Sequence, residues 1–161
     1  MLVNPTNPTN TETIVRGLPE VARALGLQVQ VVSASAVREI DLAFATLVRE
    51  QAGALFISPD SFFVSRRVQL ATLAARHGIP AVGPTHDFVE VGLLMSYGTD
   101  VADTYRQVGE YVGRILKGSK PAELPVQQAT KFEFVINEST ARALDLTVPP
   151  DLLTIADRVI E

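Results

Sequence analysis

Short apolar stretches alternate with stretches of helical periodicity along the first three quarters of the chain. Residues 54–57, Ala-Leu-Phe-Ile, form a continuous apolar run of strand length, whereas Ile40 and Phe44 recur at helical spacing. Gly17 and Pro19 interrupt the first helical stretch, so a kink or a late start is expected there. These patterns predict strands at residues 2–3, 27–32, 54–57, 79–82, 92–97 and 131–136, and helices at 14–25, 35–48, 61–77, 103–117, 137–144 and 151–160.

Continuous apolar strands that alternate with helices are typical of parallel βαβ units with helices on both faces of the sheet. The sequence therefore predicts an α/β fold of the three-layer αβα kind, with a mostly parallel, Rossmann- or flavodoxin-like sheet. After Gly83 the regular alternation of apolar strands and helices ends. In residues 131–136 apolar residues alternate, with Phe132, Phe134 and Ile136 on one face, which predicts an edge or antiparallel strand.

The first strand runs directly into a turn, Asn4-Pro5-Thr6-Asn7-Pro8. A phosphate-binding loop would need glycines and a lysine here, and residues 4–13 contain neither. The turn nevertheless lies between the carboxyl end of a strand and a helix, where open α/β sheets bind their ligands. Asn4, Thr6 and Asn7 are therefore candidate ligand-binding residues. The alternative is that they only form a turn and cap the helix.

Small polar residues also follow the other predicted strands. Because the carboxyl ends of parallel strands meet at one edge of a sheet, their side chains are expected to converge there. Such an edge suits the recognition of a small polar molecule by hydrogen bonds, with an aromatic ring available for stacking. Taken singly, each serine is more often a helix cap than a ligand contact. The candidates at these strand ends are Ser33, Ser35, Ser58, Asp60, Ser61, Phe62 and Thr85.

Composition narrows the classes of function. A chain of 161 residues that is 47% hydrophobic and 20% charged suits a globular α/β domain. The net charge of -4, with both signs interspersed, argues against nucleic-acid binding. With no cysteine and two histidines, neither a metal site nor a cofactor is predicted. No stretch reaches the roughly 18 apolar residues of a membrane helix, and no signal peptide is recognised.

Patterns typical of catalysis are weak. The chain has no GxSxG nucleophile elbow. His86 and Asp87 beside Ser58 or Ser61 come nearest to a triad, but adjacent side chains cannot readily orient one another across a single peptide. No catalytic residue is predicted, and the chain is expected to bind rather than transform its ligand. A stand-alone flavodoxin-like enzyme or regulatory domain is the alternative.

Several stretches together resemble one family. They include LVNPTNP, SPDSFFVSRR, LAARHGIPA, FVEVGLLMSYG, RILKGSKPAELPVQQATKFEFVIN and TARALDLTVPPDLLTIADRVIE. Over essentially its whole length the chain is similar to ABC-transporter substrate-binding proteins of the tryptophan/tyrosine-type group. The resemblance implies a type I periplasmic binding fold, in which two α/β lobes close on a ligand, and this chain corresponds to the C-terminal half. It would begin within the first strand of the second lobe.

The resemblance also implies a division of the chain. Residues 1–84 and 124–161 would form the second lobe, and residues 85–123 would cross the hinge with a strand and a helix that belong to the absent first lobe. The polar strand ends would face the interlobe cleft, and Ser96 and Tyr97 would lie near it from the other side. Many relatives carry aromatic residues around the Gly83-Pro84-Thr85 turn, and their absence here leaves the identity of the ligand open.

The implied partners are a small-molecule ligand such as an amino acid and, in the full-length protein, an ABC permease in a periplasmic setting. Without a first lobe, one apolar helix stripe loses part of its cover, so a homodimer or larger assembly is expected, with exchange of the hinge-crossing arm as one route. Ligand binding by this chain alone is expected to be weak or absent. The stripe comprises Val108, Tyr111, Val112, Ile115 and Leu116.

Overall fold

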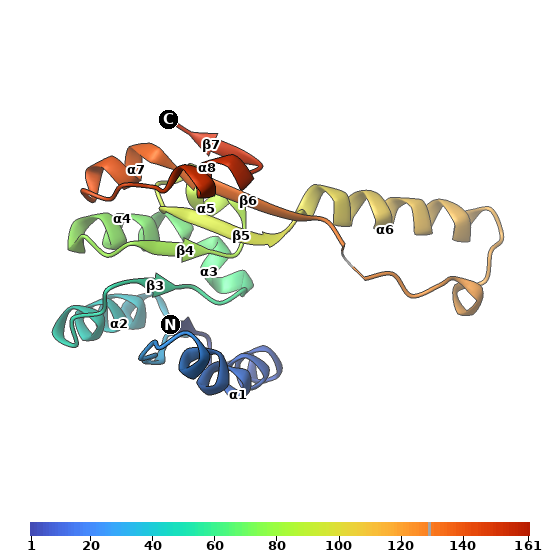
Figure 1. Ribbon diagram of the computed structural model, residues 1–161. Coiled ribbons are helices and arrows are strands. Elements are labelled where there is room, and N and C mark those ends of the chain that lie inside the picture. The colour runs from blue at the N-terminus through green and yellow to red at the C-terminus, as the bar shows by residue number, and fades with distance from the viewer. Residues whose placement is uncertain (129) are drawn as a thin grey trace.

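The computed structural model describes residues 1–128 and 130–161 (Figure 1). Ala129, within the predicted lobe segment 124–161, lies outside the described residues. The strands are β1 (Leu2–Val3), β2 (Val32–Ser33), β3 (Leu55–Phe56), β4 (Ala81–Gly83), β5 (Met95–Thr99), β6 (Phe132–Asn137) and β7 (Arg158–Ile160). The helices are α1 (Pro8–Ala24), α2 (Val37–Arg49), α3 (Ser61–Ser65), α4 (Arg67–His77), α5 (His86–Glu90), α6 (Val101–Leu116), the 3-10 turn η1 (Pro121–Glu123), α7 (Glu138–Ala143) and α8 (Pro150–Ile155).

The strands form one mostly parallel arrangement. A five-stranded sheet has the order β3-β4-β5-β6-β7, and β1 pairs with β2 beside it. A parallel bridge joins Leu2 to Ile57, and Ser58 N donates to Leu2 O at 3.0 Å, so β1 lies between β2 and β3. Among the strand pairs of the described residues, only β5–β6 is antiparallel. The predicted α/β class with a mostly parallel sheet is confirmed.

The core lies between this sheet and its flanking helices. Phe44 on α2, Phe63 on α3 and Phe88 on α5 are completely buried, together with Leu2 and Ile136 on the strands. Burial of aromatic and branched apolar side chains is the main favourable term in folding, so these residues fix the helices on the sheet.

Three predicted elements differ in the structure. The strand expected at 27–32 is shorter and later in the structure, where Val32–Ser33 form β2 and pair with Leu2–Val3. The helix expected at 61–77 divides at Arg66, whose backbone (φ -111°, ψ 13°) is not helical. The helix expected at 151–160 ends at Ile155, and the chain then forms β7 against β6.

Two further predictions each left two alternatives open, and the structure excludes one of each. The first helix begins at Pro8 and runs through Gly17 and Pro19, rather than starting late. Strand β6 is antiparallel to β5, as its alternation indicates, but it lies between β5 and β7 and is not an edge strand.

Helix α6 stands apart from the rest of the molecule. It projects from the ends of β5 and β6 well beyond the other helices (Figure 1), and none of its residues is buried. Its apolar residues, Val108, Val112, Ile115 and Leu116 among them, are exposed. Helix α5 and strand β5, which precede α6, pack within the main body. None of the described helices has the length and apolar character needed to cross a membrane.

Candidate ligand-binding site

The loops that follow β1 and β3 are joined by one carboxylate. Asp60 accepts hydrogen bonds from Asn4 Nδ2 at Oδ1 and from Asn7 Nδ2 at Oδ2, each at 2.9 Å. The same carboxylate accepts from the backbone N–H of Phe62 at 2.9 Å and so caps α3. Residues from two strand ends, far apart in sequence, therefore form one rigid polar cluster.

Hydrogen bonds also favour the charged form of the Asp60 carboxyl group. Partial burial by itself would raise the pKa of Asp60, but the hydrogen bonds from Asn4, Asn7 and Phe62 N–H outweigh it and lower the pKa below its usual value. Thr6 adds a further contact, because its N–H and hydroxyl both donate to Asn4 Oδ1 at 3.0 and 2.8 Å. The predicted residues Asn4, Thr6, Asn7 and Asp60 thus lie together, and their polar atoms largely satisfy one another.

Two hydroxyls, one just after the end of β4 and one near the start of β5, have no partner among the described residues. Ser96 is only 1% exposed, and its Oγ, like Thr85 Oγ1, is buried and makes no hydrogen bond in the described part of the chain. Residue 96 pairs with Gly83 in the β4–β5 ladder, so Ser96 and the turn at Thr85 belong to the same region of the sheet edge. A buried polar group without a partner costs stability, typically about 1–3 kcal/mol. Such groups mark places where a ligand can supply the missing hydrogen bonds.

An exposed aromatic cluster continues this edge along β5 and β6. The rings of Tyr97 and Phe132 are stacked, with centroids 5.8 Å apart and an interplanar angle of 10°. Phe134, opposite Tyr97 in the antiparallel ladder, meets the tyrosine ring edge-on at 6.3 Å. Tyr97 is 62% exposed and Phe132 49%, so apolar ring surface is available to a flat ligand.

The remaining predicted residues lie apart from these contacts. Ser33 and Ser61 are exposed, and Ser58 is buried beside β1. Ser35 acts in local helix capping, because its N–H and hydroxyl donate to Glu39 Oε2 at 2.7 and 2.9 Å. The helix predicted from residue 35 begins only at Val37, with Ala36 at the N-cap position.

Phe62 is half-buried and lies 5.5 Å from Phe63, its ring packed against the core. A partly buried ring of this kind has less free surface for stacking than Tyr97. The aromatic surface of the edge therefore comes mainly from β5 and β6.

A second polar network surrounds His86. Its Nδ1 lies 2.8 Å from Glu133 Oε2 on β6, and its Nε2 lies 3.3 Å from Asp87 Oδ1. Atoms of His86, Asp87 and Glu90 lie within 4.8 Å of one another, which is the spacing of metal ligands. Glu90 is also paired with Arg158 at 2.6 Å. These contacts form a polar network between α5 and the last two strands, in which a carboxylate oxygen, and not a serine hydroxyl, lies at each ring nitrogen of His86.

Sequence reasoning missed Phe132, Phe134 and Glu133 as site residues. The alternation of Phe132 and Phe134 was visible, but only the antiparallel register of β5 and β6 brings their rings to Tyr97. Glu133 carried no signal, because its contact with His86 spans 47 residues.

The chain matches the family described as ABC transporter substrate binding protein over residues 1–160. It belongs to this family. The resemblance drawn from its sequence motifs is therefore confirmed. Among curated proteins, the Tyrosine-binding protein of Clostridioides difficile (strain R20291) is 26% identical over 141 residues, which are 88% of this chain and 41% of that protein.

Solved structures agree with this assignment. A conserved domain protein from Vibrio cholerae is similar with a TM-score of 0.87 and 25% identity, over 98% of this chain and 53% of the other. An ABC domain from Streptococcus pneumonia in complex with L-Trp gives a TM-score of 0.82 and 27% identity, over 93% and 52%. The open, ligand-free structure of a substrate binding protein with adhesive properties from Clostridium difficile (TM-score 0.68, 23% identity, over 99% and 52%) shares the fold. This family member spans about half the length of the relatives it matches.

Proposed function

We propose that this chain forms one lobe of the solute-binding component of an ABC importer and that its carboxyl-end edge binds an amino acid. The observations that carry the proposal are the buried, unpartnered hydroxyls of Thr85 and Ser96 and the exposed ring of Tyr97, which follows Ser96 in β5 and points to the other face of the strand. Hydroxyls without partners suit the polar α-amino and carboxylate groups, and the tyrosine ring suits an apolar side chain.

An aromatic amino acid is the class that these groups fit best. The stacked rings of Tyr97 and Phe132 offer a flat surface on which a third ring could stack. Relatives described as tyrosine-binding, or solved with L-Trp, support the same class. The small residue at Gly83 does not argue against it, because a Cβ there would lie 2.6 Å from Phe88 Cβ. Gly83 is therefore required by core packing.

The other predicted site residues would hold the ligand-binding edge in place or lie along it. The cluster of Asn4, Asn7 and Asp60 holds the two loops in a fixed geometry before a ligand arrives, which lowers the entropy cost of binding. Ser33, Ser58 and Ser61 are proposed to lie along the same edge.

The second wall of the site would come from another lobe, by closure about a hinge. The 85–123 division stays a prediction. Within it, α6 is the part that projects from the body without a buried residue, so we propose that its apolar face packs on the other lobe. In that setting the whole protein would deliver its ligand to an ABC permease from the periplasmic or extracellular side.

The test is a titration of the isotopically labelled chain with L-tryptophan, followed by NMR. Weak binding, about millimolar, is expected, because one wall supplies only part of the contacts. The shifted amides should cluster at Thr85, Ser96 and Tyr97. Tyr97→Ala should weaken binding about tenfold, whereas the matched variant Tyr105→Ala, which removes an even more exposed ring on α6, should leave it unchanged.

Saturable shifts confined to another surface, or none at all with L-tryptophan, would overturn the proposed site. Equal affinity for L-tryptophan and L-alanine would exclude the aromatic class while leaving the edge itself in place.

A further inference from the structure

Helix α5 presents three side chains of the kinds that bind metal ions. His86 and Glu90 occupy its first and last positions, four residues apart, and therefore lie on the same side of the helix. Asp87 follows His86 directly, and one ligand atom from each of the three residues lies within 4.8 Å of the other two. Phe88 and Val89, between them in the sequence, are buried, so the helix is fixed on the sheet and holds its polar side chains in a defined geometry.

A carboxylate on β6 orients the histidine ring. Glu133 Oε2 lies 2.8 Å from His86 Nδ1 and accepts its hydrogen bond, so in the neutral ring Nδ1 carries the proton and Nε2 keeps a lone pair. This Nε2 makes no hydrogen bond among the described residues, and Asp87 Oδ1, a second acceptor, lies 3.3 Å from it. Two acceptor atoms this close repel one another unless a proton or a cation lies between them. Histidines that bind metals typically have a carboxylate on their other ring nitrogen, as His86 has.

The spacing and the charge of these groups fit a divalent cation. Tetrahedral coordination at about 2.1 Å places two ligand atoms about 3.4 Å apart, close to the 3.3 Å between His86 Nε2 and Asp87 Oδ1. Glu90 pairs through one oxygen with Arg158 at 2.6 Å, which leaves its second oxygen for an ion. With His86 neutral, the three carboxylates and one guanidinium of the network carry a net charge of -2. Arg67 adds a more distant positive charge near Glu90, so moderate affinity is expected.

The cluster is open to solvent on one side and lies over the sheet on the other. The side chains of His86 and Asp87 are 30% and 45% exposed, so an ion can reach them and keep bound water. In the sheet, Ser96 pairs with Gly83, where a Cβ would touch Phe88 on α5, so Ser96 also points to the α5 side. Its buried hydroxyl has no partner among the described residues, and such a group marks a place where a bound water or ion is expected.

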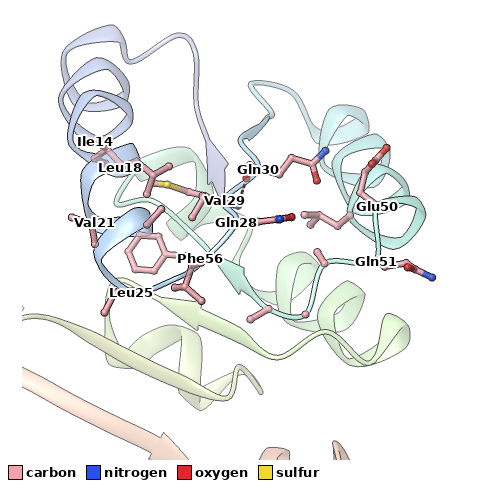
Figure 2. A pocket seen from close by; sticks show the side chains of 17 residues that line it. Ile14, Leu18, Val21, Leu25, Gln28, Val29, Gln30, Glu50, Gln51 and Phe56 are labelled. Atoms are coloured by element: carbon pink, nitrogen blue, oxygen red, sulfur yellow. Dashed lines mark hydrogen bonds between the residues drawn. The ribbon is translucent and has the colours of Figure 1, made fainter.

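The hollow between α1 and the end of α2 offers no comparable set of ligands (Figure 2). It has a volume of about 880 Å³ and is lined mostly by apolar side chains, Leu18 and Phe56 among them. Of the described residues that line it, Glu50 is the only acidic one, and none is a histidine. The ligands for a cation gather instead at α5. Composition did not predict this site, because His86 and Glu133 meet across 47 residues of sequence.

We propose that His86, Asp87 and Glu90 bind one divalent transition-metal ion of the zinc type, and that Glu133 is the positioning residue that orients the imidazole. The imidazole nitrogen favours this class of ion over Mg²⁺ and Ca²⁺, which prefer sites made of oxygen atoms alone. Water fills the remaining coordination position. The ion connects the start of α5 to its end and, through Glu133, to β6, so it should raise the thermal stability of the chain.

The test is a calorimetric titration of the chain with zinc chloride at neutral pH, after treatment with a chelator. One ion per chain is expected, with a dissociation constant on the order of 10 μM, because three protein ligands in an open site bind moderately. His86→Gln should weaken binding at least about thirtyfold. His77→Gln is the matched control, since this second histidine lies at the end of α4, stacked on Phe44, and should leave binding unchanged. Asp87→Asn, at a more exposed residue, is a second variant and should weaken binding about tenfold.

The role of Glu133 is tested by ¹⁵N NMR of the histidine rings. Zinc should shift the Nε2 signal of His86 and leave the proton on its Nδ1, whereas the signals of His77 should not change. Glu133→Gln should weaken zinc binding about tenfold. It should also lower the share of the Nδ1–H tautomer of His86 in the metal-free chain, an effect that a loss of packing alone would not produce.

Three results would overturn the proposal. Equal losses of binding in His86→Gln and His77→Gln would mean that zinc binds histidines without a defined site. Unchanged zinc binding in His86→Gln, or equal affinity for Mg²⁺, would reduce the cluster to a patch of carboxylates. A titration that shows no saturable binding up to about 1 mM zinc would exclude the site altogether.

Discussion

Asn4 Nδ2 donates a 2.9 Å hydrogen bond to Asp60 Oδ1, across 56 residues of sequence. This bond connects the turn after β1 to the N-cap of α3, and Asn7 repeats the connection to the other carboxylate oxygen. The edge of the sheet where a ligand is proposed to bind is thus held by side chains as well as by strands.

The first prediction concerns Asp60. Replacing Asp60 with alanine removes the acceptor of three hydrogen bonds and should lower the free energy of unfolding by about 2–3 kcal/mol at neutral pH. Urea denaturation measures the change. The matched control is Asp41→Ala, at an exposed residue of α2, which should change stability by less than about 0.5 kcal/mol. Equal effects of the two substitutions would show that the cluster does not stabilise the fold.

The second prediction is the pH dependence of that difference. Because the folded-state pKa of Asp60 is lowered, its contribution is present above the ordinary aspartate pKa of about 3.9 and is lost as the pH falls through the folded value. The stability gap between the wild type and Asp60→Ala should therefore be constant from about pH 7 to pH 5 and close below about pH 4. A gap that widens in acid would contradict the assignment.

The third prediction concerns the close approach of β5 to the turn after β4. A Cβ on Gly98 would lie 2.0 Å from the carbonyl oxygen of Pro84, so Gly98→Ala should destabilise the protein by about 3 kcal/mol. The control is Gly109→Ala on α6, where nothing lies within 4 Å, and which should stabilise by about 0.5–1 kcal/mol. Thermal unfolding of both variants measures the opposite signs. Two changes of the same sign would refute the explanation.

The fourth prediction separates stability from binding at Ser96. Its hydroxyl is buried without a partner, so Ser96→Ala should leave the free energy of unfolding unchanged or raise it by about 1 kcal/mol. The same substitution should weaken binding of L-tryptophan, because the ligand is proposed to use this hydroxyl. Denaturation and the NMR titration are compared on one sample. A loss of stability together with unchanged binding would identify Ser96 as purely structural.

The fifth prediction concerns the exposed face of α6. Its apolar residues lack cover in this chain, so we expect reversible association at micromolar concentration in sedimentation velocity. Val112→Asp should reduce that association, whereas Arg114→Asp, a charge change at a neighbouring residue outside the apolar stripe, should have a smaller effect. A single monomeric species at all concentrations would contradict the expectation.

The sequence predicted well those features that depend on short-range pattern. Helical spacing predicted an apolar stripe of Val37, Ile40, Phe44, Leu47 and Val48 on α2. Its centre, Ile40, Phe44 and Leu47, is buried, whereas Val37 and Val48 are exposed. The polar strand ends were also visible. The sequence pattern did not show which groups these polar side chains bond to. Ser35 was therefore predicted to contact a ligand, although its hydroxyl donates to Glu39 within the same segment.

For residues 156–160 the local sequence pattern gave the wrong prediction. Ala-Asp-Arg-Val-Ile continues a helical stretch in the sequence, yet the chain turns after Ile155 and adds β7 beside β6. The N–H of Asp157 donates to Phe134 O at 2.9 Å, a bond that satisfies a strand edge otherwise left open. Long-range hydrogen bonding overrode local helix propensity there.

The sequence by itself determined the alternation of strands and helices, the parallel character of the sheet and the family, because these follow from local periodicity and motif. Only the tertiary structure decided which polar side chains satisfy one another and which hydroxyls of the described residues stay unpartnered. Those properties depend on strand order and register, and therefore on contacts between residues far apart along the chain.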